Sequence, residues 1–559
     1  MSEHILEEPI YTEARHLPII KHFAKRINLV DTIDQLVGSQ MEISPGLTVL
    51  AMVLDTLSGR SPLYRLKEFF DEKDSELLLG TEVDPACFAD YNVGRAMDQI
   101  YETGTQKIYA QIIQNALDVF EIQTNCFHFD TTSITVYGDY DCQDPPFELT
   151  YGHSKDKRPD LKQFVVSMLC VERNIPLLGA CHNGNSSDKT LNNELLSNIG
   201  KHMAQHGLEP GAFIYVADAA YVTEDNLKKS RQRNLKVLSR LPANYSECSR
   251  VIQEAVATNE WIHIGTLAES SGSAKRPPAY YKAFDTQVQL YENNYRAIVL
   301  HSSVHDKRRH KRIDRLLAVK RQQLEKLCKD TAAKPFFCRD DAQEATSKLH
   351  AVAKSGYHTL QIQIEEKAKY GRGRPTNGQP RVPQGYQYIL SYKIEENDQA
   401  VKPLRLEAGC FVLLTNLSTD QEIKEWPADK LLQLYKEQNG IEKNFSFLKD
   451  PVIVNSIFLK KPERIEVLGL ILLISLLIWR LMERCMQQYV EKNNSSPGIT
   501  GWKDRPTRKP TAFMMTTKFS SVLLVKQGKE RKLARALKPV HIEYLKALGL
   551  SSRPAQFRK

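Results

Sequence analysis

The chain has 559 residues, more than one ordinary hydrophobic core supports, which predicts two to four domains. Hydrophobic residues make up 42% of it and charged residues 26%, a globular balance that excludes wholesale disorder. The net charge is +9, and residues 501–559 alone carry +12, so the remainder is slightly acidic. A basic segment on a near-neutral body favours nucleic acid as a partner, with a solvated tail as the alternative.

The cysteines and the apolar runs bear on the cellular compartment. The ten cysteines are scattered, without a CxxC pair or zinc spacing, which is typical of buried thiols in a reducing compartment. The N-terminus, MSEHILEEPI, is acidic and does not resemble a secretory leader. The most apolar run, Val467 to Trp479, has 13 residues, so it favours a buried core helix over a bilayer span. We therefore expect a cytoplasmic protein without a membrane partner.

Residues 1–120 are predicted to form a helical N-terminal domain. Apolar residues recur three and four apart in the stretches 18–38, 47–59 and 61–71. A packing module and a reader of DNA ends are equally good interpretations, because no helix-turn-helix is evident.

Residues 121–240 change to the pattern of an α/β sheet. Stretch 126–138 is β-branched and aromatic, and stretch 161–184 contains two strand-like runs around a polar turn. An amphipathic helix at 190–206 precedes a short apolar strand at 211–220. Strand, strand, strand, helix, strand is the order in which a ribonuclease-H-like core begins, although many α/β folds begin similarly.

The rest of the chain is predicted to interrupt and then complete this core. Alternating stretches in residues 241–405 indicate a β-rich insertion, with one basic helical arm beginning at Lys307. Residues 406–490 return to the core with a strand at 409–416, a helix at 429–450 and an apolar helix at 464–488. Residues 491–559 form a basic C-terminal tail.

Two acids lie where strands should be apolar. Asp130 sits within Phe-His-Phe-Asp-Thr-Thr, and Asp218 ends the run Ile-Tyr-Val-Ala-Asp. An acid in a buried strand is costly unless something binds it, and phosphodiester chemistry with two Mg²⁺ ions needs several carboxylates. Each acid could instead cap a turn. The competing acids lie in surroundings typical of loops or helices; they are Asp139, Asp141 and Asp225.

A third acid lies in a recognisable pattern. Tyr435, Glu442 and Lys449 are spaced seven apart, which places them on one face of a helix. The stretch resembles the signature helix of insertion-sequence transposases of the IS-four superfamily, which reads Tyr, two residues, Arg, three residues, Glu, six residues, Lys. Gln438 occupies the Arg position, so the contact made by that Arg is in doubt. An ordinary surface helix is the alternative.

Other segments resemble the sixteen-thirty-four group of the same superfamily, in the same order. They are Phe129–Ser133, Gly184–Thr190, Val216–Leu227 and Leu238–Pro242. The resemblance implies a ribonuclease-H-like α/β core in which Asp130, Asp218 and Glu442 hold two Mg²⁺ or Mn²⁺ ions. It also implies a bacterial transposase that cuts transposon ends, joins their 3′-OH groups to target DNA, and acts as a homodimer on DNA. The family usually uses a hairpin intermediate with a flipped base, and Trp261 and Trp426 are the candidates for holding that base.

Several basic and polar residues are predicted to contact DNA. The signature contributes Tyr435, Gln438 and Lys449; Gly-Arg-Gly-Arg-Pro contributes Arg372 and Arg374; the arm contributes Lys307, Arg308 and Arg309. The alternative for Arg372 and Arg374 is an ordinary basic hairpin tip. The alternative for the arm residues is a solvated helical arm that does not contact DNA. Two other functions stay open, a non-catalytic DNA-binding protein derived from a transposase and a metal-dependent nuclease without strand transfer.

Overall fold

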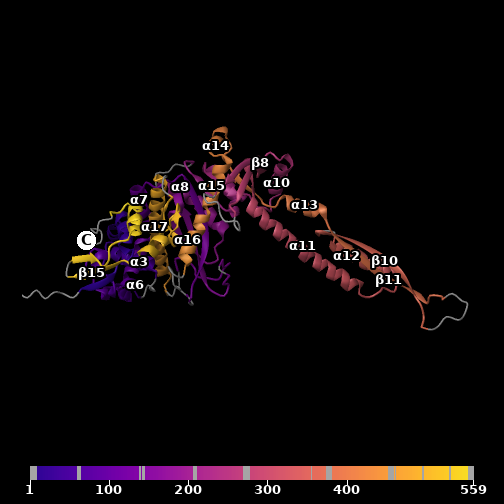
Figure 1. The fold of residues 1–559 in the computed structure, drawn as a ribbon, viewed down its shortest axis with the longest axis horizontal. Helices are drawn as coiled ribbons and strands as arrows, with labels where there is room; N and C mark the ends of the chain where they lie inside the picture. The colour runs from indigo at the N-terminus through magenta and orange to yellow at the C-terminus, as the bar shows by residue number, and fades with distance from the viewer. Residues whose placement is uncertain are drawn as a thin grey trace, which may run out of the picture. The chain divides into compact units, whose positions relative to one another are not determined.

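The computed structural model describes most of the chain in two compact units (Figure 1). The first unit comprises residues 1–239 and 434–559, and the second comprises residues 240–433. The described residues are 9–59, 65–137, 140, 145–155, 157–205, 211–267, 277–353, 356–372, 381–450, 459, 461–493, 497–527 and 530–551. Asp139, Asp141 and Arg374 lie outside them.

The N-terminal part of the first unit is helical after a short strand, β1 (Ile10–Glu13). Its α-helices are α1 (Leu17–Arg26), α2 (Leu29–Val37), α3 (Pro45–Ser58), α4 (Leu66–Asp71), α5 (Ser75–Leu79), α6 (Asp90–Thr103) and α7 (Thr105–Phe120). Ser44 caps α3 by accepting a hydrogen bond from the Leu47 N–H, and Pro45 follows at the first helical position. These helices are continuous with the core, because α3, α6 and α7 all pack against the long helix α17 (Pro462–Lys492).

A mixed sheet forms the centre of the first unit. Its strands lie in the spatial order β4 (Pro176–His182), β3 (Gln163–Cys170), β2 (Cys126–Thr135), β5 (Ile214–Ala217) and β6 (Lys236–Arg240). Strands β2, β3 and β4 run antiparallel, whereas β5 is parallel to β2 and β6 is parallel to β5. The predicted order of strands and the helix α8 (Asp188–Gln205) before β5 are confirmed.

Helix α17 is the core helix of this unit. It is the one helix in the described chain that is long and apolar enough to cross a membrane, yet 78% of its apolar window is buried inside the protein. It packs against β4 as well as the N-terminal helices. The predicted helix at 429–450 is in fact two helices, α15 (Ala428–Glu437) and α16 (Asn439–Lys449).

The second unit combines an antiparallel sheet with a helix-flanked hairpin. The sheet orders β7 (Ile262–Thr266), β8 (Tyr280–Leu290), β9 (Asn293–Ser302) and β12 (Cys410–Thr415). The hairpin pairs β10 (His358–Lys369) with β11 (Gly385–Glu396). The helices are α10 (Ser246–Thr258), α11 (Ser303–Ala332), α12 (Arg339–Ala353), α13 (Asp398–Leu406) and α14 (Asp420–Glu425).

This composition differs from the predicted insertion in two ways. Long helices make up much of the unit, so it is mixed rather than mostly β. Strand β12 lies within the residues of the second unit, where it pairs with β9 from Cys410 opposite His301 to Thr415 opposite Arg296. The compact unit therefore ends at Gln433 and not at residue 405.

The basic C-terminal segment is folded onto the first unit. It contains β13 (Ile499–Thr500), β14 (Pro506–Thr507), α18 (Ala512–Phe519), β15 (Leu523–Gln527), β16 (Glu530–Leu533) and α19 (Pro539–Ala547). Strand β15 lies between β1 and β16, and α18 and α19 pack against α17. Residues 497–527 and 530–551 therefore form a folded part of the first unit and not a solvated tail.

Candidate active site

The parallel pairing of β2 and β5 aligns the two aspartates. The register sets Cys126 opposite Ile214 and His128 opposite Val216, and the same offset continued by two residues sets Asp130 level with Asp218. Asp130 lies within β2, and Asp218 is the first residue after β5. Side chains at the same level of paired strands point to the same face of a sheet, so both carboxylates lie on one face of this sheet.

Local hydrogen bonds fix both carboxylates. Asp130 Oδ1 accepts a hydrogen bond from the Thr131 N–H at 2.8 Å. Asp218 Oδ1 accepts one from the Ala220 N–H at 3.1 Å and thereby caps the short 3₁₀ turn Ala219–Tyr221. Asp218 therefore does cap a turn, which is the alternative role for a strand-terminal acid. It does not compete with ligand binding, since a carboxylate has several acceptor positions.

The electrostatics of this pair are unfavourable without a cation. Burial raises the pKa of Asp130 to about 6, and the charges of Asp218 and Asp188 act in the same direction. Burial also raises the pKa of Asp218, and the negative charge of Asp188 raises it further. Lys155 opposes both shifts. Half-buried carboxylates that repel one another are the arrangement expected of a site that binds a cation.

Two residues of this site were not among the predicted ones. Asp188, the first residue of α8, accepts a hydrogen bond from the Thr131 hydroxyl and forms an ion pair of 3.3 Å with Lys155. The Lys155 ammonium also donates to the Thr131 carbonyl oxygen at 2.7 Å. The signal for Asp188 was its place in the Gly-Asn-Ser-Ser-Asp segment, but Lys155 lies in a loop with no distinctive pattern.

Helix α16 covers the face of the sheet to which Asp130 belongs. Met168 of β3 is paired directly with Asp130, and the Asn444 amide of α16 lies 3.4 Å from the Met168 sulfur. The helix also packs against β2. Glu442 lies in the first turn of α16, but its side chain is exposed. Among the described residues, no three His, Cys, Asp or Glu side chains lie close enough together to hold a metal ion. The structure thus brings Asp130 and Asp218 together and does not bring Glu442 to them.

A buried polar cluster anchors α16. The Asn444 Nδ2 donates to the Asn174 carbonyl oxygen at 2.8 Å, and its Oδ1 accepts from the Arg480 Nε of α17 at 2.7 Å. Arg480 in turn pairs with Glu483. Gly440 allows α16 to lie this close to Asn174, because a Cβ at position 440 would lie 1.8 Å from the side-chain Nδ2 of Asn174. The glycine was visible in the sequence, but its partner was not.

The remaining predicted site residues are distributed over several elements. Tyr435 lies on α15, Gln438 lies at the junction and Lys449 ends α16, so the predicted single helical face holds only for Glu442 and Lys449. Asp225 is exposed in the first turn of α9 (Glu224–Gln232). The second unit carries the other candidates, which are Lys307, Arg308 and Arg309 on α11, Arg372 after β10, Trp261 before β7 and Trp426 after α14.

Comparisons with known proteins bear on this site. Residues 124–478 match the family described as "Transposase DDE domain", and residues 11–114 match a domain of unknown function. A cryo-EM structure of a piggyBac transposase synaptic complex with hairpin DNA matches at 10% identity and a TM-score of 0.35, covering 92% of this chain and 82% of that chain. Comparison with curated proteins gives no match. The range of the family match includes Asp130, Asp218 and Glu442 and spans more than half of the sequence. The chain therefore belongs to the DDE transposase domain family.

Proposed function

We propose that this transposase binds the ends of an insertion sequence, cleaves the DNA there and joins the freed 3′-OH ends to target DNA. The single observation that carries the proposal is the level pair of half-buried carboxylates, Asp130 and Asp218, within the range that matches the family. The narrower assignment to the IS-four superfamily, with Glu442 as the third acid, rests on the signature stretch from Tyr435 to Lys449.

The donor set suits Mg²⁺ or Mn²⁺. Both aspartates offer hard oxygen ligands, and a bound cation would relieve the repulsion that raises the pKa of each carboxyl group. Two such ions, when bound, activate the attacking oxygen and stabilise the leaving oxygen of a phosphodiester. Glu442 would complete the set by turning from solvent towards the sheet face that α16 already covers.

The chain's own residues would divide the remaining work. Asp130 and Asp218 would hold the cations, while Asp188 and Lys155 hold Thr131 beside them. In cleavage a water oxygen forms a bond to phosphorus and the 3′ oxygen leaves. In strand transfer that 3′ oxygen attacks a target phosphate and displaces another 3′ oxygen, so no further reactant is needed. We propose that Tyr435, Gln438 and Lys449 contact DNA and that two copies act together on it.

The test is a cleavage and strand-transfer assay on a labelled end-containing duplex with a target plasmid. Asp130→Asn and Asp218→Asn should each reduce both steps by at least about 100-fold, since loss of even an outer partner of a metal ligand costs about 10–100-fold. Binding to the same duplex should change little, because DNA affinity comes mainly from contacts to phosphates. Asp225→Asn, which removes an exposed acid, is the matched control.

The same assay separates the alternatives. A wild-type protein that binds ends without cutting them would be a DNA-binding protein only, and one that cuts without joining would be a nuclease. Full cleavage by Asp130→Asn would show that Asp130 is not a ligand and would end this proposal.

A further inference from the structure

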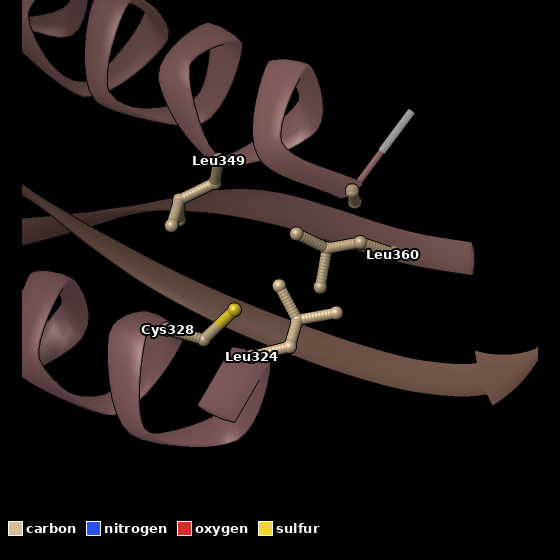
Figure 2. Close-up of a cluster of buried hydrophobic side chains, with 5 residues drawn as sticks. Leu324, Cys328, Leu349 and Leu360 are labelled. Atoms are coloured by element: carbon tan, nitrogen blue, oxygen red, sulfur yellow. The ribbon is translucent and has the colours of Figure 1, made fainter. Parts of the chain in front are cut away.

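Helix α11 has one anchored side. Its buried residues recur at intervals of four and seven and are Ile313, Leu317, Leu324 and Cys328. The first two pack with Val401 and Ala408, and the last two pack with Leu349 and Leu360. Figure 2 shows Leu324 and Cys328 of α11 pointing towards Leu349 of α12 and Leu360 of β10. Because these contacts fix the rotation of the helix, they also determine which residues face the opposite side.

The opposite side of α11 carries basic residues in two groups, one in each half of the helix. At 100° per residue, six exposed cations fall within about 60° of the direction opposite the buried side. They are Arg308, Lys311, Arg312, Arg315, Lys326 and Lys329, and we call them the α11 stripe. Asp330 is the one acid of α11 that shares this side. The stripe extends over about 32 Å, at 1.5 Å per residue, which approaches one turn of duplex DNA.

The α11 stripe has no counterpart on α12, the other helix that packs against the β10–β11 hairpin. Helix α12 has two basic residues against three acids, and its Lys348 already pairs with Glu344 at 2.8 Å. Within the described residues, no ion pair joins a member of the stripe to an acid. Six like charges on one face repel each other, and a polyanion is the partner that removes this repulsion.

We propose that the α11 stripe binds the phosphate backbone of duplex DNA, without reading its sequence. This inference rests on the proposed function, and it adds a surface and a mode of contact. The stripe consists of Lys and Arg, which suit phosphate contacts, and the two positions between its halves are Val319 and Gln322. Lys307 and Arg309, predicted as DNA contacts, lie roughly 90° and 110° from the centre of the stripe by this geometry, and therefore outside it.

The experiment compares two double variants that lose the same charge. Arg315→Gln with Lys326→Gln removes two members of the stripe. Lys320→Gln with Arg321→Gln removes two exposed cations that flank the buried side. Binding to a fluorescent random duplex and to an end-containing duplex is measured by anisotropy between 50 and 200 mM salt. Circular dichroism melts confirm that both variants are folded.

The stripe variant should bind both duplexes more weakly. Each lost phosphate contact lowers the slope of log affinity against log salt by about 0.9, so the slope should fall by about 1.8, a loss of about 60-fold at 0.1 M salt. The flanking variant should keep the wild-type slope. Equal losses of affinity in the two variants would mean that only the net charge of α11 matters, and not the position of the stripe. A loss of affinity confined to the end-containing duplex would mean that the stripe recognises a DNA sequence. Either outcome overturns the inference. Because binding is measured without cleavage, a catalytically inactive wild type would contradict the proposed function and leave this result intact.

Discussion

At the scale of single residues, the sequence indicated the two aspartates because Asp130 interrupts an apolar strand and Asp218 ends one. That signal is local, since a charge among buried residues is costly and needs a reason. Asp188 was visible only through the Gly-Asn-Ser-Ser-Asp segment and Lys155 gave no signal, because both lie outside strands and meet Thr131 only in the folded chain. Residues brought together by loops are the part of a site that a single sequence does not specify.

The raised pKa of Asp130 predicts a gain in stability on its removal. The native state holds a proton on this group more tightly than the unfolded chain does, so the charged form destabilises the fold above a pH of about 6. The cost vanishes below the ordinary pKa near 4. In the absence of metal at pH 7.5, Asp130→Asn should raise the free energy of unfolding by about 1–2 kcal/mol, with the gain shrinking towards pH 4.

The measurement is urea denaturation at pH 7.5 and pH 4.5, with and without Mg²⁺. Magnesium should stabilise the wild type at the higher pH and stabilise Asp130→Asn much less. Asp225→Asn again serves as the control, because its carboxylate is exposed on α9. A variant that is less stable than the wild type in EDTA at pH 7.5 would show that the carboxylate is not under electrostatic stress.

At the scale of elements, periodicity predicted the strands β2, β3, β4 and β5 and the helices α8, α11 and α17. It did not predict the break at Gln438 between α15 and α16, because Gly440 alone does not say whether a helix continues. Nor did it predict that β12 pairs with β9, since the pattern of a buried apolar strand does not identify its partner. Pairing partners, and not composition, decide such assignments.

The anchoring of α16 predicts that Asn444 controls the position of Glu442. Asn444→Ala removes the partner of the Arg480 Nε and of the Asn174 carbonyl oxygen, both in partly buried surroundings. The free energy of unfolding should fall by about 2–3 kcal/mol, as expected when buried polar groups lose their hydrogen bonds. DNA cleavage should fall even at temperatures where the variant is fully folded, because α16 would no longer be held against the sheet.

Ser446→Ala on the same helix is the matched control, since Ser446 is exposed and bonds only within α16 among the described contacts. Cleavage rates, DNA affinity and melts are measured together for both variants. If Asn444→Ala loses stability but retains the wild-type cleavage rate below its melting temperature, the cluster supports the fold and does not position Glu442.

At the scale of the whole molecule, the sequence showed where positive charge accumulates but not how it is used. Residues 501–559 suggested a DNA-binding tail, yet part of their charge is used inside the first unit. Arg531 of β16 is buried, and its Nε donates to the Asp74 Oδ2 at 2.6 Å across 457 positions of sequence. Burial would raise the pKa of Asp74, but the hydrogen bonds from Arg531 and the Leu77 N–H lower it overall. A partner so distant cannot be found from local composition.

The folded C-terminal segment predicts a structural cost for changes that a solvated tail would tolerate. Arg531→Gln should lower the free energy of unfolding by about 3–5 kcal/mol, because it leaves the Asp74 carboxylate buried without its ion pair. Lys532→Gln removes the same charge from the neighbouring position, where the side chain is 70% exposed, and should change stability by less than about 0.5 kcal/mol. Urea denaturation of the two variants makes the comparison.

Deletion of residues 501–559 should likewise destabilise the first unit, since it removes the strand that pairs with β1 and the helices that pack on α17. Loss of DNA binding on deletion would then report unfolding, so the variants with single charge changes are the proper test of the segment's contribution to DNA affinity. Equal stability of Arg531→Gln and Lys532→Gln would mean that the C-terminal segment is not integrated into the fold.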